Sequence, residues 1–225
     1  MTSSQRCWDP YLSERDKETV RTLGRRPVGI GERPALVLVD NYVAAYGSRA
    51  DAAADDYRWL AVDAQRRVLD VARETGVPVV HVSRQDERAM PGWNMAIHAG
   101  DKRGRTDIGR QDAEGNHIVE PLAPRDNEVF LHKTAPSAFW GTPLAGILTY
   151  LGVDSLFVCG QATGGCVRAT VVDAVSHRLR VTVPEDCVFD TYDATHAINL
   201  FDMHSKYADV VDSSHVIDWM RQHPR

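Results

Sequence analysis

The sequence predicts an α/β fold of three layers, a doubly wound, Rossmann-like arrangement around a six-stranded, mostly parallel sheet. Two observations predict it. Short continuous apolar runs, which are typical of strands covered on both faces, alternate along the chain with stretches of helical period. The length of 225 residues suits one such domain with a sizeable core. Because strands that alternate with helices pair in parallel, helices are expected on both faces of the sheet.

Residues 1–33 are expected to form an N-terminal arm ahead of a single domain that spans residues 34–225. Ser13 and Asp16 have the spacing of a capping box, in which two side chains satisfy free N–H groups at the start of a helix. This spacing predicts a short helix that runs to about Leu23, after which glycine and proline end it.

The first elements of the domain follow from apolar runs and from helix signals. Residues 35–40, Ala-Leu-Val-Leu-Val-Asp, have the pattern of a strand in a covered parallel sheet. Residues 56–75 carry apolar side chains at helical spacing, and Gly76 ends the helix that they predict. Residues 78–83 are the second predicted strand.

Residues 84–126 interrupt this alternation. They are polar and highly charged, with proline and glycine but no strong period. A stretch of this length inside a compact domain usually has a function or lies at an interface. We therefore expect an irregular insertion near the active site or near a subunit interface.

After the insertion the alternation resumes. The expected strands are 128–132, 155–159, 179–184 and 209–212. The expected helices are 143–151, 166–177, 195–206 and 214–222. Together with the first two strands, these make the six strands of the predicted sheet.

Apolar side chains in the arm and in the insertion predict self-association. The residues concerned are Trp8, Tyr11, Leu12, Leu23, Met90, Trp93, Met95 and Ile97. Monomers rarely leave so much apolar surface in water, and symmetric association is the commonest way to cover it. We expect a homodimer or homotetramer; the alternative is an arm that packs back on its own domain.

Composition excludes several classes of partner. The formal net charge of −5 and the pI of about 6.0 favour neither nucleic acid nor an anionic membrane surface. No apolar run approaches the ~20 residues of a membrane-spanning helix. The first residues lack the apolar segment of a secretory signal, so the expected location is the cytoplasm.

Cysteine and histidine spacing predicts neither a disulfide framework nor a metal site. The four cysteines, at 7, 159, 166 and 187, contain no CxxC pair. The nine histidines show no HExxH motif and no pair at ligand spacing beside a carboxylate. We therefore expect no metal and no organic cofactor.

Cys166 occupies the most informative position in the chain. It follows the strand 155–159 and a turn of small residues, 160–165, and it precedes a helical pattern. The free N–H groups and the positive dipole end of that helix favour a thiolate, and they could hold an oxyanion formed from a carbonyl. Two alternatives are a small buried thiol, the expected state of Cys159, and a turn that binds phosphate or only reverses the chain.

Asp40 and Lys133 end two other predicted strands. Sites in doubly wound sheets form beyond the carboxyl ends of the strands, where Cys166 also lies. A lysine ammonium lowers the pKa of a neighbouring thiol, and an aspartate can accept its proton and pass it to a leaving nitrogen. The alternatives are an Asx turn at Asp40 and a solvated Lys133. His132 should point to the opposite face of its strand from Lys133.

The set Asp40, Lys133 and Cys166, in that chain order, resembles the isochorismatase-like cysteine hydrolases. The motifs that carry the resemblance are residues 35–40, 133–144 and 158–174, and it covers roughly residues 33–220. Residues 165–170, Gly-Cys-Val-Arg-Ala-Thr, with 199–203 and 206–209, are similar to the N-carbamoylsarcosine amidohydrolase branch, which also resembles maleamate amidases.

This resemblance implies a catalytic triad in which Cys166 is the nucleophile, Asp40 the proton shuttle and Lys133 the electrostatic partner. It also implies a cis peptide between Gln161 and Ala162, with the N–H groups of Ala162 and Cys166 as the oxyanion hole. Asn41 and Tyr42 replace a glutamine-containing segment that is common in the family, and Gln161 and Gly164-Gly165 vary the turn. The departures leave the triad intact and bear on substrate identity.

The implied function is a cysteine-dependent amidohydrolase that cleaves a linear amide or ureido C–N bond of a small molecule, through a covalent thioester and with release of ammonia. One alternative is an isochorismatase-type vinyl-ether hydrolase, which does not need a nucleophilic cysteine. Another is a non-catalytic binding protein of the same fold. A third alternative is a module that binds phosphate through residues 160–165, but this turn has neither the lysine–serine pair nor the glycine spacing of such modules.

Aromatic side chains are the candidates for substrate contacts. Those expected near the pocket are Tyr42 or Tyr46 after the first strand, Trp93 in the insertion, and Phe139 and Trp140 after Lys133. Ordinary packing is the alternative for each of them.

Overall fold

The computed structural model describes residues 6–84 and 114–225. Its strands are β1 (Pro34–Val39), β2 (Val79–Arg84), β3 (Val129–Lys133), β4 (Ser155–Gln161), β5 (Arg180–Pro184), β6 (Val188–Phe189) and β7 (Asp209–Val211). Its α-helices are α1 (Glu14–Leu23), α2 (Val43–Tyr46), α3 (Tyr57–Thr75), α5 (Leu144–Tyr150), α6 (Arg168–Ser176), α7 (Asp193–Lys206) and α8 (Ser213–Gln222).

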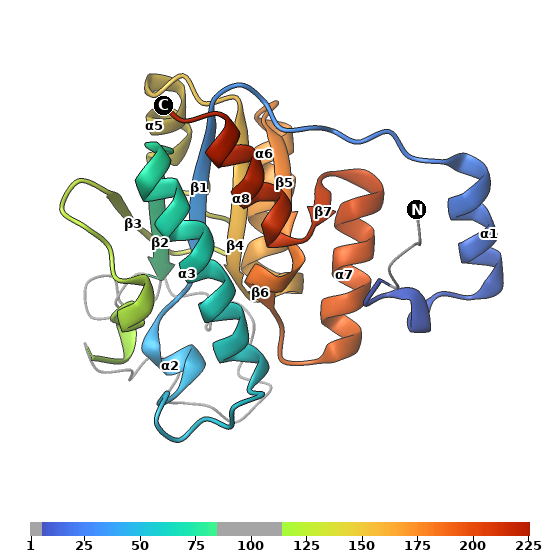
Figure 1. Ribbon diagram of the computed structural model, residues 1–225, viewed down its shortest axis with the longest axis horizontal. Helices are drawn as coiled ribbons and strands as arrows, with labels where there is room; N and C mark the ends of the chain where they lie inside the picture. Colours follow the sequence, from blue (N-terminus) through green and yellow to red (C-terminus); the bar gives the residue numbers. More distant parts are fainter. Residues whose placement is uncertain (1–5, 85–113) are drawn as a thin grey trace.

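The strands form one parallel sheet in the order β3-β2-β1-β4-β5-β7, with β6 beside the end of β4. Figure 1 shows this sheet between two layers of helices. The predicted three-layer α/β fold is confirmed. The six predicted strands form the path of the sheet. The additional strand β6 is only two residues long and lies outside any pattern that a sequence window detects.

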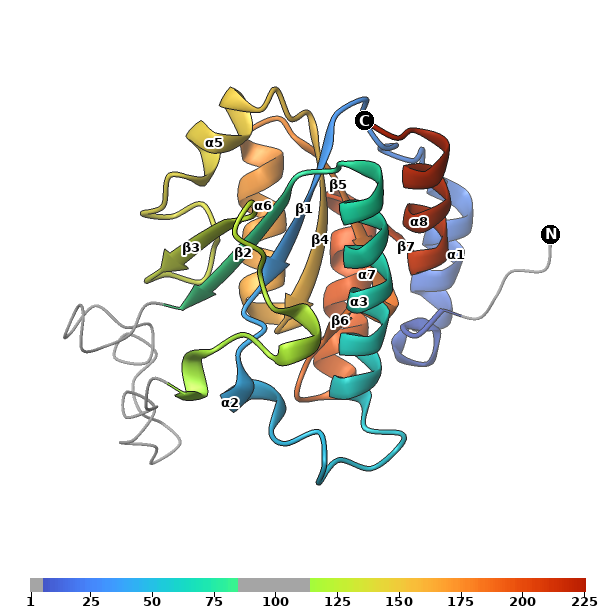
Figure 2. The ribbon, with the colours of Figure 1, turned by 60° about the vertical axis from the view of Figure 1, so that its left-hand side comes forward.

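Each face of the sheet has its own apolar core. Side chains of α5, α6 and α7 cover one face, and those of α3 and α8 cover the other. Figure 2 shows α3 and α8 together on one side and α5 and α6 on the opposite side. Helix α3 matches its prediction closely: Asp56 caps its start, and Gly76 ends it in the left-handed conformation that glycine adopts without strain.

The arm contacts the domain on both sides of α1. The Trp8 side chain is buried against α7, and the Arg25 guanidinium pairs with Asp209 on β7. Between these two points lies α1, which begins at the predicted capping box of Ser13 and Asp16 and contains no buried residue. Figure 1 shows α1 beyond α7 at the outer edge of the molecule.

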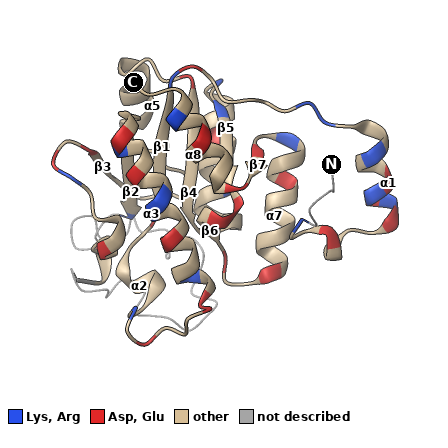
Figure 3. Cartoon of the chain, viewed as in Figure 1, with Lys and Arg blue, Asp and Glu red and all other residues tan. Residues whose placement is uncertain are grey.

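Charges of both signs are interspersed along α1 and α3 (Figure 3). In the part of the chain that the structure describes, no helix is long and apolar enough to cross a membrane.

Candidate active site

The three side chains that the sequence analysis selected meet at the carboxyl edge of the sheet. Asp40 directly follows β1, Lys133 is the last residue of β3, and Cys166 lies in the turn after β4. The Nζ atom of Lys133 is 2.8 Å from Oδ2 of Asp40 and 3.2 Å from Sγ of Cys166. The same ammonium donates to the carbonyl of Ala135 at 3.1 Å. One cation therefore links the carboxylate and the thiol.

All three side chains lie out of water. Asp40, Lys133 and Cys166 are 3, 2 and 8% exposed. His132, one residue before Lys133, is exposed and points to the other face, as strand alternation predicts. Burial by itself lowers the pKa of Lys133, but the neighbouring Asp40 and Cys166 outweigh it and raise that pKa above its ordinary value. Lys133 is therefore an ammonium ion.

The resting form of Cys166 is the thiol, which corrects the expectation that its position favours a thiolate. Burial raises the pKa of this thiol to about 12, and the negative charge of Asp40 raises it further than Lys133 lowers it. The physical reason is the charge balance. Asp40 and Lys133 already neutralise each other, so loss of the thiol proton would leave a net negative charge in a desolvated site.

Removal of the thiol proton therefore needs an acceptor, and Asp40 can supply it. Its Oδ2 atom faces Lys133, while Oδ1 is buried and receives no hydrogen bond within the described residues. A buried carboxylate oxygen without a donor is a strong proton acceptor. The geometry can therefore move a proton from sulfur to Asp40 when a substrate carbonyl arrives.

The turn that carries Cys166 is tightly constrained. The peptide bond between Gln161 and Ala162 is cis, and a single π-helical turn, Thr163–Val167, follows it. The α-helix begins only at Arg168, two residues later than predicted, so Cys166 lies inside the π-helical turn. Ala162 directly precedes this turn and Cys166 lies inside it; their N–H groups remain the predicted oxyanion hole.

Hydrogen bonds fix this turn from two sides. The Gln161 side chain donates to the Asp40 carbonyl at 2.9 Å, which ties the turn to β1. The Gly164 N–H donates to Asp190 at 2.8 Å. A 2.8 Å hydrogen bond also joins Oγ1 of Thr163 to Nδ1 of His196 on α7. The sequence analysis did not select Asp190 or His196, and no pattern around either of them points to the turn.

The aromatic candidates for substrate contacts divide into buried, exposed and undescribed residues. Tyr46 has no exposed surface, and its hydroxyl donates to Asn41, so it supports the chain behind the site. Phe139 is also buried and stacks on His177, with ring centroids 5.0 Å apart. Trp140 is 69% exposed, and Trp93 lies outside the described residues. Packing therefore accounts for Tyr46, contrary to its predicted role, while the substrate contacts expected of Phe139 and Trp140 stay predictions.

Tyr42 is the tyrosine that lies at the site. Burial raises its pKa, the charge of Asp40 raises it further, and Arg84 lowers it. The guanidinium carbon of Arg84 is 4.4 Å from the centre of the Tyr42 ring. The sequence analysis left Tyr42 and Tyr46 as alternatives and did not select Arg84, which ends β2 at the border of the insertion.

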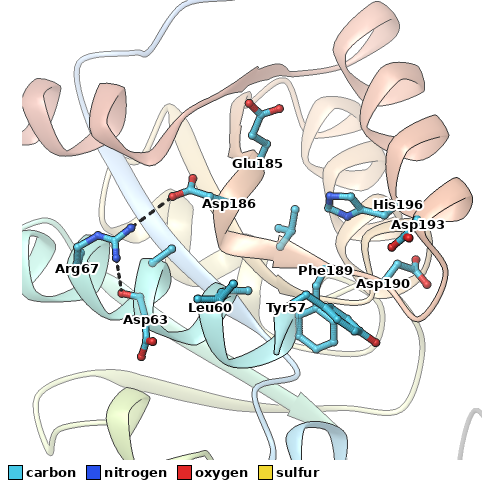
Figure 4. A pocket seen from close by; sticks show the side chains of 13 residues that line it. Tyr57, Leu60, Asp63, Arg67, Glu185, Asp186, Phe189, Asp190, Asp193 and His196 are labelled. Atoms are coloured by element: carbon cyan, nitrogen blue, oxygen red, sulfur yellow. Dashed lines mark hydrogen bonds and ion pairs between the residues drawn. The ribbon is translucent and has the colours of Figure 1, made fainter. Parts of the chain in front are cut away.

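A separate acidic groove of about 500 Å³ lies next to the turn that carries Cys166. Figure 4 shows its wall of α3 side chains facing carboxylates of the segment that leads into α7. No member of the predicted triad lines it. Asp190 and His196 do line it, and both form hydrogen bonds to the turn that carries Cys166, so the groove borders that turn. In residues 6–84 and 114–225, no group of side chains has the composition and spacing of a metal site.

Comparisons with known proteins give a consistent result. The model of the isochorismatase domain matches residues 34–215. Maleamate amidohydrolase of Pseudomonas putida is 33% identical over 198 residues, which cover 86% of this chain and 90% of that protein. N-carbamoylsarcosine amidase of an Arthrobacter species is 29% identical over 204 residues, which cover 89% of this chain and 76% of that protein.

Solved structures share the fold. A cysteine hydrolase from Pseudomonas syringae pv. phaseolicola superposes with a TM-score of 0.75 at 21% identity, over 88% of this chain and 97% of that one. N-carbamoylsarcosine amidase from Thermoplasma acidophilum superposes with a TM-score of 0.64 at 27% identity, over 80% of this chain and 96% of that one.

Proposed function

Because the chain belongs to the isochorismatase-like cysteine hydrolases, we propose that it hydrolyses a linear amide or ureido bond of a small molecule with Cys166 as its nucleophile. The observation that carries this proposal is the position of the Lys133 ammonium, 2.8 Å from Asp40 and 3.2 Å from Cys166. The two amidohydrolase relatives support a C–N bond outside peptides as the bond that is cleaved.

The reaction begins with the transfer of the thiol proton to Asp40, while Sγ of Cys166 adds to the substrate carbonyl. The N–H groups of Ala162 and Cys166 stabilise the oxyanion. Asp40 then gives its proton to the nitrogen, the C–N bond breaks, and ammonia or a small amine leaves. Water, deprotonated by Asp40, hydrolyses the thioester and restores the thiol. The sum is one amide and one water converted to one acid and one amine.

Lys133 has an electrostatic role in this sequence. Its ammonium holds the Asp40 carboxylate in place and remains near the sulfur throughout the reaction. When the thiol proton moves, the cation offsets the negative charge that collects on the carbonyl oxygen and sulfur. Neither a metal nor an organic cofactor takes part in these steps.

The test is ammonia release by the purified protein from maleamate, N-carbamoylsarcosine, biuret and nicotinamide. Turnover of at least one of these is expected, with loss of activity in Cys166→Ala and near-normal activity in the control Cys159→Ala. Quenched reactions should contain a protein adduct on the Cys166 peptide.

Two other outcomes would contradict the proposal. Release of pyruvate from isochorismate by Cys166→Ala would identify a vinyl-ether hydrolase that needs no nucleophile. Binding of these amides without turnover by the wild-type protein would identify a binding protein of the same fold.

A further inference from the structure

Arg84 lies beside the predicted triad on the same face of the sheet. It is the register partner of Lys133 in the pairing of β2 with β3. Two residues earlier, the partners Val82 and Leu131 both belong to the apolar core beneath α5 and α6. Side chains two residues apart leave a strand on the same face. Arg84 and Lys133 therefore project from adjacent strands to the same side.

Two neighbours hold the Arg84 side chain in one position. Its guanidinium carbon lies 4.4 Å from the centre of the Tyr42 ring, in cation–π geometry. Its Nε atom donates to Oδ1 of Asn116 at 2.8 Å. Because stacking and the Nε bond fix the plane, the two terminal nitrogens form a rigid fork.

The positive charge of Arg84 forms no ion pair with a carboxylate among residues 6–84 and 114–225. Other partly buried guanidinium groups are paired, such as Arg73 with Glu128 at 2.7 Å. Asp40, the acid of the predicted triad, is already paired with Lys133 at 2.8 Å. Within the described part of the chain, the site therefore has a cation without a paired carboxylate beside its neutral ion pair and its neutral thiol.

Tyr42 connects this cation to the reacting atoms. The charges of Asp40 and Cys166 raise the pKa of its hydroxyl and that of Arg84 lowers it, so Tyr42 lies within the electrostatic range of all three groups. A small molecule whose carbonyl reaches Cys166 would bring its other end past Tyr42 to the fork. A guanidinium fork matches the two oxygens of a carboxylate.

We propose that Arg84 binds a carboxylate at the far end of the substrate, so that the preferred substrates are short amido or ureido acids rather than neutral amides. This inference rests on the proposed function and adds the substrate class and the residue that selects it. Arg84 is then a binding residue that contacts no reacting atom.

The experiment compares maleamate with maleamide, which has the same scissile amide but no carboxylate. The wild-type protein should prefer maleamate in kcat/KM. Arg84→Gln should raise KM for maleamate roughly 10- to 100-fold, which corresponds to a charged hydrogen-bond pair. Its kcat for maleamate and both constants for maleamide should stay within about threefold, since the reacting groups are untouched.

Two matched variants separate charge from geometry. Arg84→Lys keeps the charge and loses the fork, so it should show an intermediate KM for maleamate. Arg66→Gln removes a charge from the exposed face of α3, where Arg66 pairs with Asp70, and should leave the preference unchanged. Equal losses on both substrates, or no loss on either, would overturn the assignment of Arg84.

Binding of maleate to Cys166→Ala protein, measured by calorimetry, gives a readout that does not need turnover. Maleate should bind this variant, and the additional change Arg84→Gln should weaken binding at least about tenfold. If wild-type protein hydrolyses neither amide while maleate binding still depends on Arg84, the proposed reaction fails and the anion site stands. Binding that is independent of Arg84 would refute the anion site, whatever the reaction.

Discussion

Gly160 and Val39 are register partners whose backbones touch. A Cβ atom on Gly160 would lie 2.0 Å from the carbonyl oxygen of Val39, and the φ angle of Gly160 is +118°. Asp40 follows Val39 directly, and the turn to Cys166 follows Gly160. The close approach of these two backbones thus fixes the position of Asp40 relative to the turn that carries Cys166.

Gly160→Ala should destabilise the protein by at least about 2–3 kcal/mol, because the methyl group collides with backbone and the φ angle strains any other residue. Urea unfolding measures the loss. The control is Gly146→Ala in α5, where the added Cβ meets no atom within 4 Å and alanine favours the helix. Equal stability of the two variants would contradict this account of the turn.

Cys166 and Cys159 should respond in opposite ways to replacement by alanine. Cys166→Ala and Cys166→Ser should abolish ammonia release and keep the folded structure. Cys159→Ala removes a side chain with no exposed surface and should cost roughly 1–2 kcal/mol of stability while turnover stays nearly normal. Steady-state kinetics and urea unfolding on the same preparations check both. More than a few per cent of wild-type rate in Cys166→Ala would remove the nucleophile from the mechanism.

Asp40→Asn should make the thiol of Cys166 more reactive while it abolishes turnover. The Asp40 charge raises the pKa of that thiol and Lys133 lowers it, so without the carboxylate only burial opposes the lowering effect of Lys133. The rate of iodoacetamide labelling near neutral pH, read by mass spectrometry of the Cys166 peptide, should rise. Lys133→Met should slow the same labelling. A slower reaction in Asp40→Asn would show that Asp40 does not oppose thiolate formation.

Acid should destabilise the fold through His204. Burial lowers its pKa from 6.5 to about 4, and the charges of Arg25 and Arg6 add to the effect. Between these two values the unfolded chain binds a proton that the folded protein does not bind. The free energy of unfolding should therefore fall as the pH drops from about 6.5 toward about 4, and urea titrations at several pH values measure it.

His204→Gln should reduce the dependence of the unfolding free energy on pH between about 4 and 6.5. His215→Gln, at an exposed position of α8, should leave this pH dependence unchanged. Part of the slope should remain in His204→Gln, because burial also lowers the pKa of His81 and His196. An unaltered slope in His204→Gln would assign the acid sensitivity to other groups.

The predicted assembly depends on the arm. Helix α1 buries no residue, and its Leu23 and Val20 are 79 and 50% exposed. A ten-residue helix is marginal by itself in water, so a partner that covers this face would stabilise it. Light scattering should give a multiple of 25.0 kDa, and Leu23→Glu should lower it. Thr22→Glu, which is off the face shared by Val20 and Leu23, is the control; a wild-type mass near 25.0 kDa would exclude the oligomer.

The long elements were predictable because their signals are local. Residues 34–39 form a continuous apolar run, and α3 has a cap at Asp56 and a glycine stop at Gly76. Strand β6 and helix α2 were not predicted, since two and four residues carry no period. β6 exists because Val188 and Phe189 pair with the end of β4, a contact across nearly thirty residues that a local pattern does not encode.

The meeting of Asp40, Lys133 and Cys166 was predictable because each ends a strand or follows one. The choice between Tyr42 and Tyr46 was not. It depends on two hydrogen bonds of the Asn41 side chain, which donates to Gln65 on α3 and accepts from the Tyr46 hydroxyl. Together they hold Tyr46 in the interior. Arg84 was missed because its importance comes from its register with Lys133, and register is absent from a sequence read alone.

The protonated state of Cys166, the proposed nucleophile, affects how readily oxidants inactivate the protein. Peroxide and related oxidants attack thiolates far faster than thiols, and access matters as well. Cys166 is 8% exposed and the pKa of its thiol is raised to about 12, so this residue is poorly suited to become a sulfenic acid between turnovers. In the proposed mechanism, Cys166 becomes reactive only while a carbonyl occupies the site and Asp40 takes the proton. Burial of this thiol should therefore slow its loss to oxidants.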